Sequence, residues 1–185
     1  RKQQWKYCKA DKRTKIQNDI VPLLQKYNLP TIIYCVSRKE TEAISTSLKS
    51  LKYKSKHYHA NISDEEKHSV HTKFLDDKIQ IVVATLAFGM GINKPNVGLV
   101  IHYGCPKNLE NYYQEIGRAG RNGDAAYCYM FYSKKDFVAQ AHMIGNSKNK
   151  EHQSNQTNLL EQIIEYCTQS KLCRRKILLS YPFYY

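Results

Sequence analysis

The sequence predicts an α/β fold, in which a parallel sheet is covered by helices on both faces and is followed by a short helical appendage. Up to about residue 137, short apolar segments alternate with segments whose apolar residues recur at helical spacing. Strands that are apolar throughout are typical of a parallel sheet buried between helices. No strand-like segment follows, so we expect residues 1–137 to form one domain and residues 138–185 to form a linker and the appendage.

Five buried strands are expected from runs rich in β-branched and aromatic residues, at residues 31–36, 56–60, 79–85, 97–103 and 125–132. Residues 1–10 show no pattern from which an element can be predicted. Residues 145–157 are rich in Asn, Ser, Gln and Lys, which predicts a loop or linker.

Helices are expected between the strands and in the appendage. The first covers residues 16–27, where Pro22 marks either a kink or a first turn. The second has an apolar face made of Ala43, Ile44, Leu48 and Leu51. The third begins at Ser63, which has the spacing of a capping box with Glu66. The last three are expected at residues 108–116, 159–167 and 173–181.

The chain has a net charge of +13, concentrated toward its N-terminal end. Residues 1–56 hold 14 Lys and Arg against 4 Asp and Glu, whereas residues 57–137 hold 9 of each. A basic excess attracts polyanions such as nucleic acid, although a bias in composition gives the same charge. No apolar run is long enough for a transmembrane helix or a secretory signal. The six cysteines are dispersed, which favours a reducing, intracellular setting.

Four polar segments follow predicted elements at one end of the expected sheet: residues 37–39, 59–61, 85–93 and 117–123. Because ligands bind at the carboxyl ends of strands in an open parallel sheet, we expect one edge to gather hydroxyls, amides and cations suited to phosphate. Within ATLAFGMGINKPNV, residues 84–97, Gly89 and Gly91 would let the backbone approach a phosphate closely. A tight surface turn would give the same pattern.

The segment QEIGRAGR, residues 114–121, places Arg118 and Arg121 three residues apart, each after a glycine. At a helix end, both guanidinium groups would emerge on one side and repel each other unless an anion lay between them. A guanidinium group suits the charge that develops on a transferring phosphoryl group. The alternative is a pair of solvated arginines.

These segments resemble superfamily 2 helicases and, more narrowly, the RecQ family of DNA helicases. The similarity covers residues 31–133. TIIYCVSRKETEAI resembles the motif IV region, YHANISDEEK the segment after it, IQIVVATLAFGMGINKPNV motif V, and NYYQEIGRAGRNG motif VI. DEAD-box RNA helicases usually carry His at the position of Gln114 and lack FGMGINKP, so they fit less well. The resemblance implies the second of two RecA-like domains.

The resemblance also implies an ATP-dependent 3′–5′ DNA helicase motor that acts in recombination and repair, nuclear in a eukaryote and cytoplasmic otherwise. ATP and Mg²⁺ would be held mainly by a preceding RecA-like domain, whose phosphate loop GxxxxGKS/T has no counterpart in this sequence. The chain does not begin with Met, so we expect a piece of a longer protein. Because it lacks the phosphate loop, we expect this piece to be inactive alone.

The residue roles implied by the resemblance fall into two groups. Arg121 would be the arginine finger and Arg118 a second phosphate contact. The other nucleotide-binding residues would be Gln114, Gly117, Gly91 and Asn93. Single-stranded or forked DNA would contact the chain, without sequence preference, through Ser37, Arg38, His59, Thr85 and Gly89.

Residues 165–183 resemble the start of the RecQ zinc-binding module, in which four cysteines hold a structural zinc ion. Cys173, directly before Arg174 and Arg175, matches the first ligand. The other three would lie beyond Tyr185, and one thiolate cannot form a closed tetrahedral site, so we expect no zinc in this chain. Cys167 is expected to lie in the core.

Two alternatives stay open. One is an RNA helicase of the same superfamily. The other is a nucleic-acid-binding module that has kept the fold without the ATP chemistry. The presence of both arginines counts against the second, because a domain released from that chemistry need not keep them.

Overall fold

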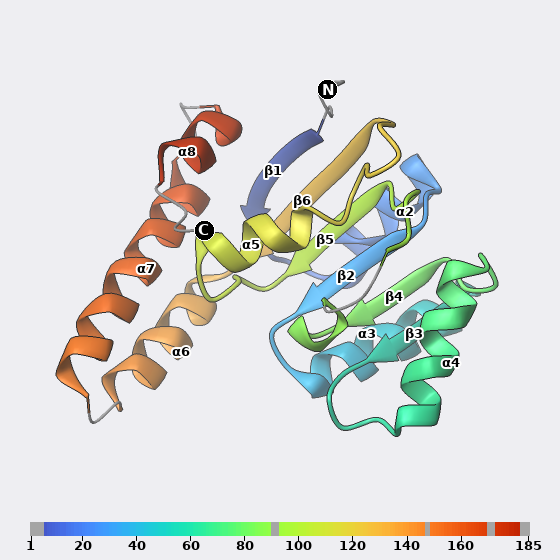
Figure 1. Cartoon of the computed structure of the whole chain (residues 1–185), viewed down its shortest axis with the longest axis horizontal. Coiled ribbons are helices and arrows are strands. Elements are labelled where there is room, and N and C mark those ends of the chain that lie inside the picture. Colours follow the sequence, from blue (N-terminus) through green and yellow to red (C-terminus); the bar gives the residue numbers. More distant parts are fainter. Residues whose placement is uncertain (1–5, 90–92, 147–148, 170–172, 182–185) are drawn as a thin grey trace.

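The computed structural model describes residues 6–89, 93–146, 149–169 and 173–181. Their centre is a parallel sheet of six strands in the order β1-β6-β5-β2-β4-β3 (Figure 1). The strands are β1 (Lys6–Lys12), β2 (Thr31–Cys35), β3 (Ser55–Tyr58), β4 (Ile81–Ala84), β5 (Leu99–Tyr103) and β6 (Ala126–Tyr132). The four inner strands, β6, β5, β2 and β4, are apolar because helices cover both of their faces.

Eight α-helices and one 3₁₀ turn, η1 (Leu86–Phe88), are formed by the described residues. The helices are α1 (Ile16–Asp19), α2 (Val21–Tyr27), α3 (Arg38–Ser50), α4 (Asp64–Leu75), α5 (Leu109–Ile116), α6 (Lys134–Gly145), α7 (Lys150–Thr168) and α8 (Arg174–Ser180). Figure 1 shows α6, α7 and α8 grouped beside the sheet, beyond α5.

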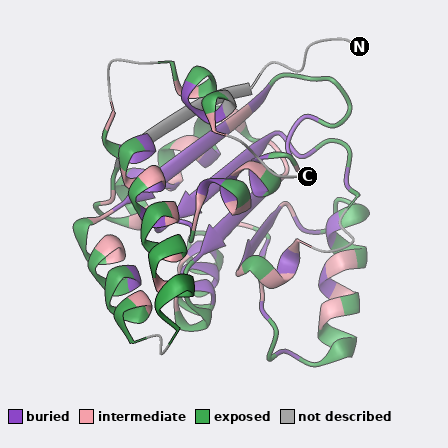
Figure 2. Ribbon diagram, turned by 60° about the vertical axis from the view of Figure 1, so that its left-hand side comes forward, coloured by how far each residue is buried: buried purple, intermediate pink, exposed green. Residues whose placement is uncertain are grey.

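Alternate residues of β2, β4, β5 and β6 enter two separate apolar cores. Ile32, Val82 and Val100 pack beneath α4, α5, α7 and α8 on one face. Ile33 and Ile101 pack on the other face, against α1, α2 and α3. Figure 2 shows the buried sheet between helices whose outer surfaces are exposed. The predicted α/β fold, with helices on both faces and a helical appendage, is confirmed.

The five predicted strands are present, each within a few residues of its expected bounds, but β1 was missed. Its sequence, KYCKADK, has no apolar run. Among the strands that the structure describes, it pairs with β6 alone, in register from Lys6 opposite Ala126 to Lys12 opposite Tyr132. An edge strand is held by backbone hydrogen bonds on one side and does not need apolar side chains on both faces. Periodicity therefore gave no signal.

The predicted loop at residues 145–157 is wrong for most of its length, because α7 begins at Lys150. Asn149 caps this helix by accepting hydrogen bonds from the backbone N–H groups of Glu151 and His152, at 3.0 and 3.1 Å. The first half of α7 is polar because it is exposed. Its buried residues lie in the second half: Leu160, Ile163, Tyr166 and Cys167.

The expected apolar face of α3 is correct only in part. Ile44 and Leu48 are buried, but Ala43 is exposed and Leu51 is 45% exposed. The buried face is completed by Thr41 and Ser45. Small polar residues are accommodated there because their hydroxyl groups find hydrogen-bond partners within the protein, as Thr41 does by donating to the Arg38 carbonyl at 2.6 Å.

The helix starts follow local sequence signals. Pro22 lies in the first turn of α2, so α1 and α2 are two short helices rather than one continuous helix. The capping box of Ser63 and Glu66 is formed at the start of α4, and Ser133 and Asp136 form another at the start of α6. The predicted boundary after residue 137 falls inside α6.

Candidate nucleotide and nucleic-acid site

The two motif VI arginines follow the end of α5. Asn108 caps the start of this helix, where its side chain accepts a hydrogen bond from the Asn111 backbone N–H at 2.8 Å. The helix ends at Gly117, and Gly120 then takes a φ of +68°, which favours glycine. A Cβ at Gly120 would lie 3.0 Å from the Ala126 Cβ. The chain therefore turns sharply between the two arginines.

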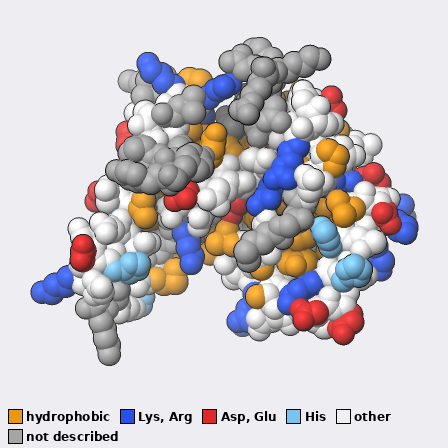
Figure 3. Space-filling view, in the orientation of Figure 1, with side chains coloured by type: hydrophobic (Ala, Val, Ile, Leu, Met, Phe, Trp, Pro, Cys, Tyr) orange, Lys and Arg blue, Asp and Glu red, His pale blue; other side chains and the backbone are white. Residues whose placement is uncertain are grey.

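Arg121 and Arg118 interact with each other and with motif V. Arg121 donates a hydrogen bond from Nη1 to the Oδ1 atom of Asn93 at 3.1 Å. Burial, and then the charge of Arg118, lower the pKa of the Arg121 guanidinium group. Arg118 Nη2 would lie 3.6 Å from a Cβ placed on Gly89. Figure 3 shows Lys and Arg side chains gathered over the region where α5 ends. The site thus concentrates positive charge where an anion could bind.

Of the other predicted nucleotide-binding residues that the structure describes, Asn93 and Gly117 contact Arg121, whereas Gln114 contacts its own helix. Gly117 is exposed, and its carbonyl accepts a hydrogen bond from Arg121 Nε at 3.4 Å. Gln114 is exposed and donates a hydrogen bond to Glu110 Oε1 at 3.3 Å. Gly91 lies outside the described residues. Gly89 has a φ of −104°, so it does not use the positive φ open to glycine.

The described residues of three of the four polar segments follow the carboxyl ends of β2, β3 and β4, as expected. Ser37 caps α3, and its hydroxyl accepts a hydrogen bond from the Glu40 N–H at 3.3 Å. Arg38 is exposed beside it. Thr85 follows β4, and its N–H donates to the Tyr58 carbonyl at 3.1 Å, which joins the ends of β3 and β4.

His59 is placed differently from the other predicted DNA contacts. It is only 5% exposed, and its Nε2 lies 2.9 Å from Glu42 Oε1. Its ring also stacks on the His57 ring, with centroids 5.4 Å apart. His59 therefore holds the strand end against α3 and does not face solvent.

The fourth polar segment, residues 117–123, does not gather at the carboxyl edge as expected. Gly120 N donates to the Val97 carbonyl at 2.8 Å, and Asn122 N donates to the Pro95 carbonyl at 3.1 Å. Both acceptors precede β5. The reason is that α5 runs back across the sheet before this loop begins, so the loop lies near the start of β5.

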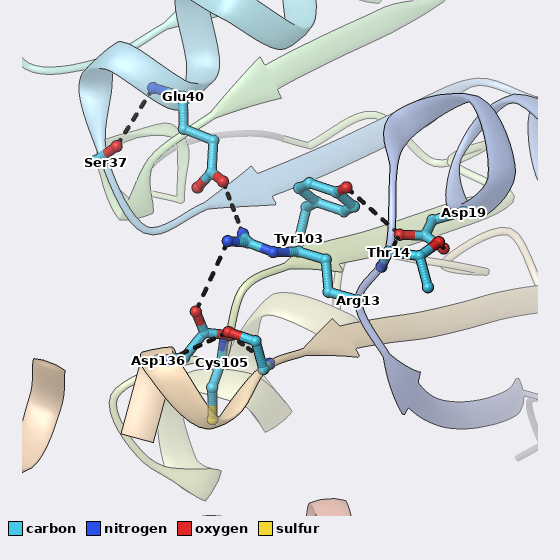
Figure 4. Close-up of polar contacts among 9 residues, drawn as sticks. Arg13, Thr14, Asp19, Ser37, Glu40, Tyr103, Cys105 and Asp136 are labelled. Carbon is cyan, nitrogen blue, oxygen red and sulfur yellow. Dashed lines mark hydrogen bonds and ion pairs between the residues drawn. The ribbon is translucent and has the colours of Figure 1, made fainter. Parts of the chain in front are cut away.

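A cluster around Arg13, at the end of β1, was not predicted from any sequence pattern (Figure 4). Arg13 Nη1 donates to Glu40 Oε1 at 2.7 Å, and its Nη2 lies 3.9 Å from Asp136 Oδ1. Its guanidinium carbon also lies 4.9 Å from the centre of the Tyr103 ring. Arg13 therefore joins the first turn of α3, next to Arg38, to the first turn of α6.

Lys94 anchors the other end of motif V. It is 2% exposed, and its Nζ lies 2.8 Å from Asp77 Oδ1 and 3.3 Å from the Leu75 carbonyl. The same ammonium group lies 5.3 Å from the centre of the Phe74 ring. Lys94, which directly follows Asn93, therefore fixes this part of motif V to the end of α4. Its ammonium group is not available to a phosphate.

Cys173 and Cys167 have different environments. Cys173 is exposed at the start of α8, whereas Cys167 is buried, as expected, with its Sγ 3.3 Å from Met130 Sδ. Among the described residues, no group of three or more His, Cys, Asp or Glu side chains is placed to bind a metal ion. In the part of the chain that the structure describes, no helix is both long enough and apolar enough to cross a membrane.

Two family models match consecutive parts of the chain. The helicase conserved C-terminal domain matches residues 12–123, and the RecQ zinc-binding family matches residues 134–182. Solved structures have the same fold. A DEAD-box protein from Methanococcus jannaschii superposes over 79% of this chain and 40% of its own, with a TM-score of 0.63 at 22% identity. The C-terminal domain of the DEAD-box protein Dbp5 covers 84% and 98%, with a TM-score of 0.59 at 19% identity.

Curated relatives include a putative ATP-dependent RNA helicase of Acanthamoeba polyphaga mimivirus, 54% identical over 89% of this chain and 30% of the relative. The mouse bifunctional 3′-5′ exonuclease/ATP-dependent helicase WRN is 39% identical over 95% of this chain and 13% of its own. The yeast ATP-dependent helicase SGS1 is 42% identical over 83% and 11%. The chain thus spans less than a third of these relatives. It belongs to the helicase conserved C-terminal domain family, in the RecQ-type form that a zinc-binding segment follows.

Proposed function

We propose that this chain is the second RecA-like half of an ATP-dependent, 3′–5′ DNA helicase motor, with the beginning of the RecQ zinc-binding module attached. The observation that carries the proposal is the pairing of Arg118 and Arg121 on one glycine turn, with Arg121 held on Asn93 of motif V. Two guanidinium groups held close together repel each other, and a bound polyphosphate would neutralise both charges.

In this proposal, a preceding domain of the full-length protein holds ATP and Mg²⁺, and this chain closes over the phosphates. Arg121 acts as the arginine finger and Arg118 as a second phosphate contact, while Gln114, Gly117 and Asn93 line the interface. Cycles of closing and opening then move the motor along one DNA strand. The zinc site would consist of Cys173 and further cysteines of the full-length protein.

The DNA strand would lie along the carboxyl edge of the sheet. Arg38, Ser37 and Thr85 are grouped there after β2 and β4, and Arg38 is exposed. Phosphate contacts of this kind do not read sequence, so binding should depend strongly on salt and weakly on sequence. His59 would act indirectly, by holding the strand end through Glu42.

The proposal is tested by Arg121→Ala in the full-length protein. DNA-stimulated ATP hydrolysis should fall by about 10³-fold or more, the scale known for arginine fingers. Exposed Lys135→Ala is the matched control and should leave the rate unchanged. Arg38→Ala should instead weaken DNA binding while leaving the rate at saturating DNA nearly intact. Normal hydrolysis by the Arg121→Ala protein would disprove the arginine-finger assignment.

An RNA helicase is the second candidate, because the mimivirus relative at 54% identity is named as one. Strand separation assays with matched DNA and RNA duplexes distinguish the two. We expect faster unwinding of DNA, in line with the relatives named as DNA helicases, such as RecQ-like DNA helicase blm-1 of Caenorhabditis elegans at 42% identity. Failure to hydrolyse ATP with either nucleic acid would favour a binding module.

A further inference from the structure

A buried histidine and a buried glutamate form a pair at the end of α5, just before the motif VI arginines. His102 on β5 is 2% exposed and Glu115 on α5 is 6% exposed. Their Nε2 and Oε2 atoms are 2.5 Å apart. This contact links the sheet to α5 in a place where the surrounding residues are apolar. It therefore ties the last turn of the helix to one point on the sheet.

A buried pair of polar side chains such as His102 and Glu115 is not an effective way to stabilise a fold. Removing charged or polar groups from water is costly, and well-packed apolar residues of similar volume often stabilise a core equally well or better. A buried polar pair does, however, fix one relative position, because only one arrangement satisfies its hydrogen bond. The location of His102 and Glu115 at the end of α5 therefore indicates a role in positioning the residues that follow this helix.

The arginine turn comes directly after Glu115 in the chain. The Arg118 N–H donates to the Glu115 carbonyl at 3.1 Å, and the Ala119 N–H donates to the Ile116 carbonyl at 3.2 Å. The backbone that carries Arg118 is thus hydrogen-bonded to the residue whose side chain holds His102. A shift of Glu115 on the sheet would move Arg118, and Arg121 one short turn later.

Aromatic rings fix His102 from two sides. The Tyr34 ring, on the neighbouring strand β2, stacks on it with centroids 5.3 Å apart. The Tyr112 ring meets it edge-on at 4.9 Å. Tyr112 in turn accepts a hydrogen bond from the Tyr166 hydroxyl of α7 at 3.2 Å. The imidazole ring is therefore held in one orientation by the sheet, by α5 and by the appendage.

The Tyr34 hydroxyl lies in the electrostatic field of the same groups. Burial and the charge of Glu115 raise the pKa of Tyr34, while Arg118 and Arg121 oppose this rise. Within the described residues, Glu115 Oε1 and Arg118 Nε are buried without a hydrogen-bond partner. The charges of Glu115 and of the two arginines thus act on the same Tyr34 hydroxyl.

We propose that His102 and Glu115 are positioning residues, which hold the end of α5 so that Arg118 and Arg121 meet the phosphates of ATP in one orientation. The inference rests on the proposed function of the two arginines. Neither residue would touch the nucleotide. A displacement of about 1 Å in a group that contacts the reacting atoms can cost on the order of 10²-fold in rate.

The test replaces the pair by an apolar one in the full-length protein, His102→Leu with Glu115→Leu. The thermal unfolding midpoint should stay equal or rise, because leucines suit this core. The kcat for DNA-stimulated ATP hydrolysis should fall by about 10- to 100-fold, with the KM for ATP within about threefold. A purely structural role would lower the unfolding midpoint and leave kcat of the folded protein intact, which would overturn the proposal.

A matched control removes a similarly short contact on the opposite face of the sheet. Tyr27→Phe deletes a hydroxyl that lies 2.6 Å from the Tyr129 hydroxyl, and kcat should not change. If the double leucine variant does not fold, Glu115→Asp carries the test, since it keeps the charge but draws the carboxylate away from His102. An unchanged kcat in Glu115→Asp would overturn the inference, and a loss of about tenfold would support it.

Failure of the proposed function and failure of the positioning role would give different results. An unmodified protein that does not hydrolyse ATP with DNA would overturn the proposed function and this inference together. An active unmodified protein whose double leucine variant is folded and equally active would overturn the positioning role alone.

Discussion

Arg121 donates a hydrogen bond from Nη1 to the side-chain oxygen of Asn93 at 3.1 Å, although 28 residues separate them in the sequence. The contact joins motif VI to motif V at the place where the proposed nucleotide interface lies. It also restrains the long Arg121 side chain, which otherwise loses much rotameric freedom on binding a phosphate.

Asn93→Ala should therefore weaken catalysis without removing the arginine. We expect kcat for DNA-stimulated ATP hydrolysis to fall by about tenfold, since a positioned side chain becomes free to sample other rotamers. The measurement is steady-state ATP hydrolysis by the full-length protein, compared with Arg121→Ala. A loss as large as that of Arg121→Ala would show instead that Asn93 contacts the nucleotide itself.

Arg13→Met should loosen the junction of β1, α3 and α6. The substitution keeps an apolar stem but deletes the hydrogen bond to Glu40, and we expect about 1–3 kcal/mol less stability in urea unfolding of the chain. Lys78→Met, which breaks only the exposed contact with Asp76, is the control and should change stability by less than about 0.5 kcal/mol. Equal effects of the two substitutions would contradict the role of Arg13.

The same junction predicts a pH dependence. Burial raises the pKa of Glu40, and the charge of Arg13 is the largest influence that lowers it. Because folding raises this pKa, protonation favours the folded state, and the contribution of Glu40 to stability is lost as pH rises through its folded pKa. Arg13→Met should raise that pKa further and extend the loss to higher pH. Titration of the Glu40 carboxyl carbon by NMR checks the direction, and an unchanged or lower pKa would refute it.

Asp77→Gly should destabilise the protein more than Lys52→Gly, because Asp77 pairs with the buried Lys94. Asp77→Gly leaves the Lys94 ammonium buried with only the Leu75 carbonyl and the Phe74 ring, and we expect a cost of about 1–3 kcal/mol. The backbone tolerates glycine, since Asp77 has a φ of 58°. Lys52 has a φ of 66° and is exposed, so Lys52→Gly is the matched control and should be neutral or slightly stabilising. Urea unfolding of both variants decides the point.

Gly120→Ala should be more harmful than Gly123→Ala. Both glycines have positive φ, at +68° and +89°, so both substitutions add backbone strain of about 1 kcal/mol. Only at Gly120 would the new Cβ also meet packed atoms, the Ala126 Cβ at 3.0 Å and the Asp124 carbonyl at 3.1 Å. Thermal unfolding should show the difference, and ATP hydrolysis should fall further in Gly120→Ala because the arginine turn is displaced. Equal midpoints and rates would contradict this.

The predicted strands and helix caps were largely correct where the signal is local. Strands β2, β4, β5 and β6 are apolar in nearly every residue, and capping boxes depend on residues three apart. The errors at β1 and at the start of α7 have one cause. An edge strand and an exposed helix carry polar sequences, so their structure depends on neighbours that periodicity does not reveal.

The sequence by itself determined the family, the parallel sheet and the motif residues, because these depend on long colinear motifs and on apolar runs read directly from the chain. Only the tertiary structure decided which groups meet. It placed Asn93 on Arg121, Arg13 on Glu40, and His102 on Glu115. Such contacts join residues 13 to 28 positions apart on different elements, so they depend on how the helices cross the sheet, which no local pattern encodes.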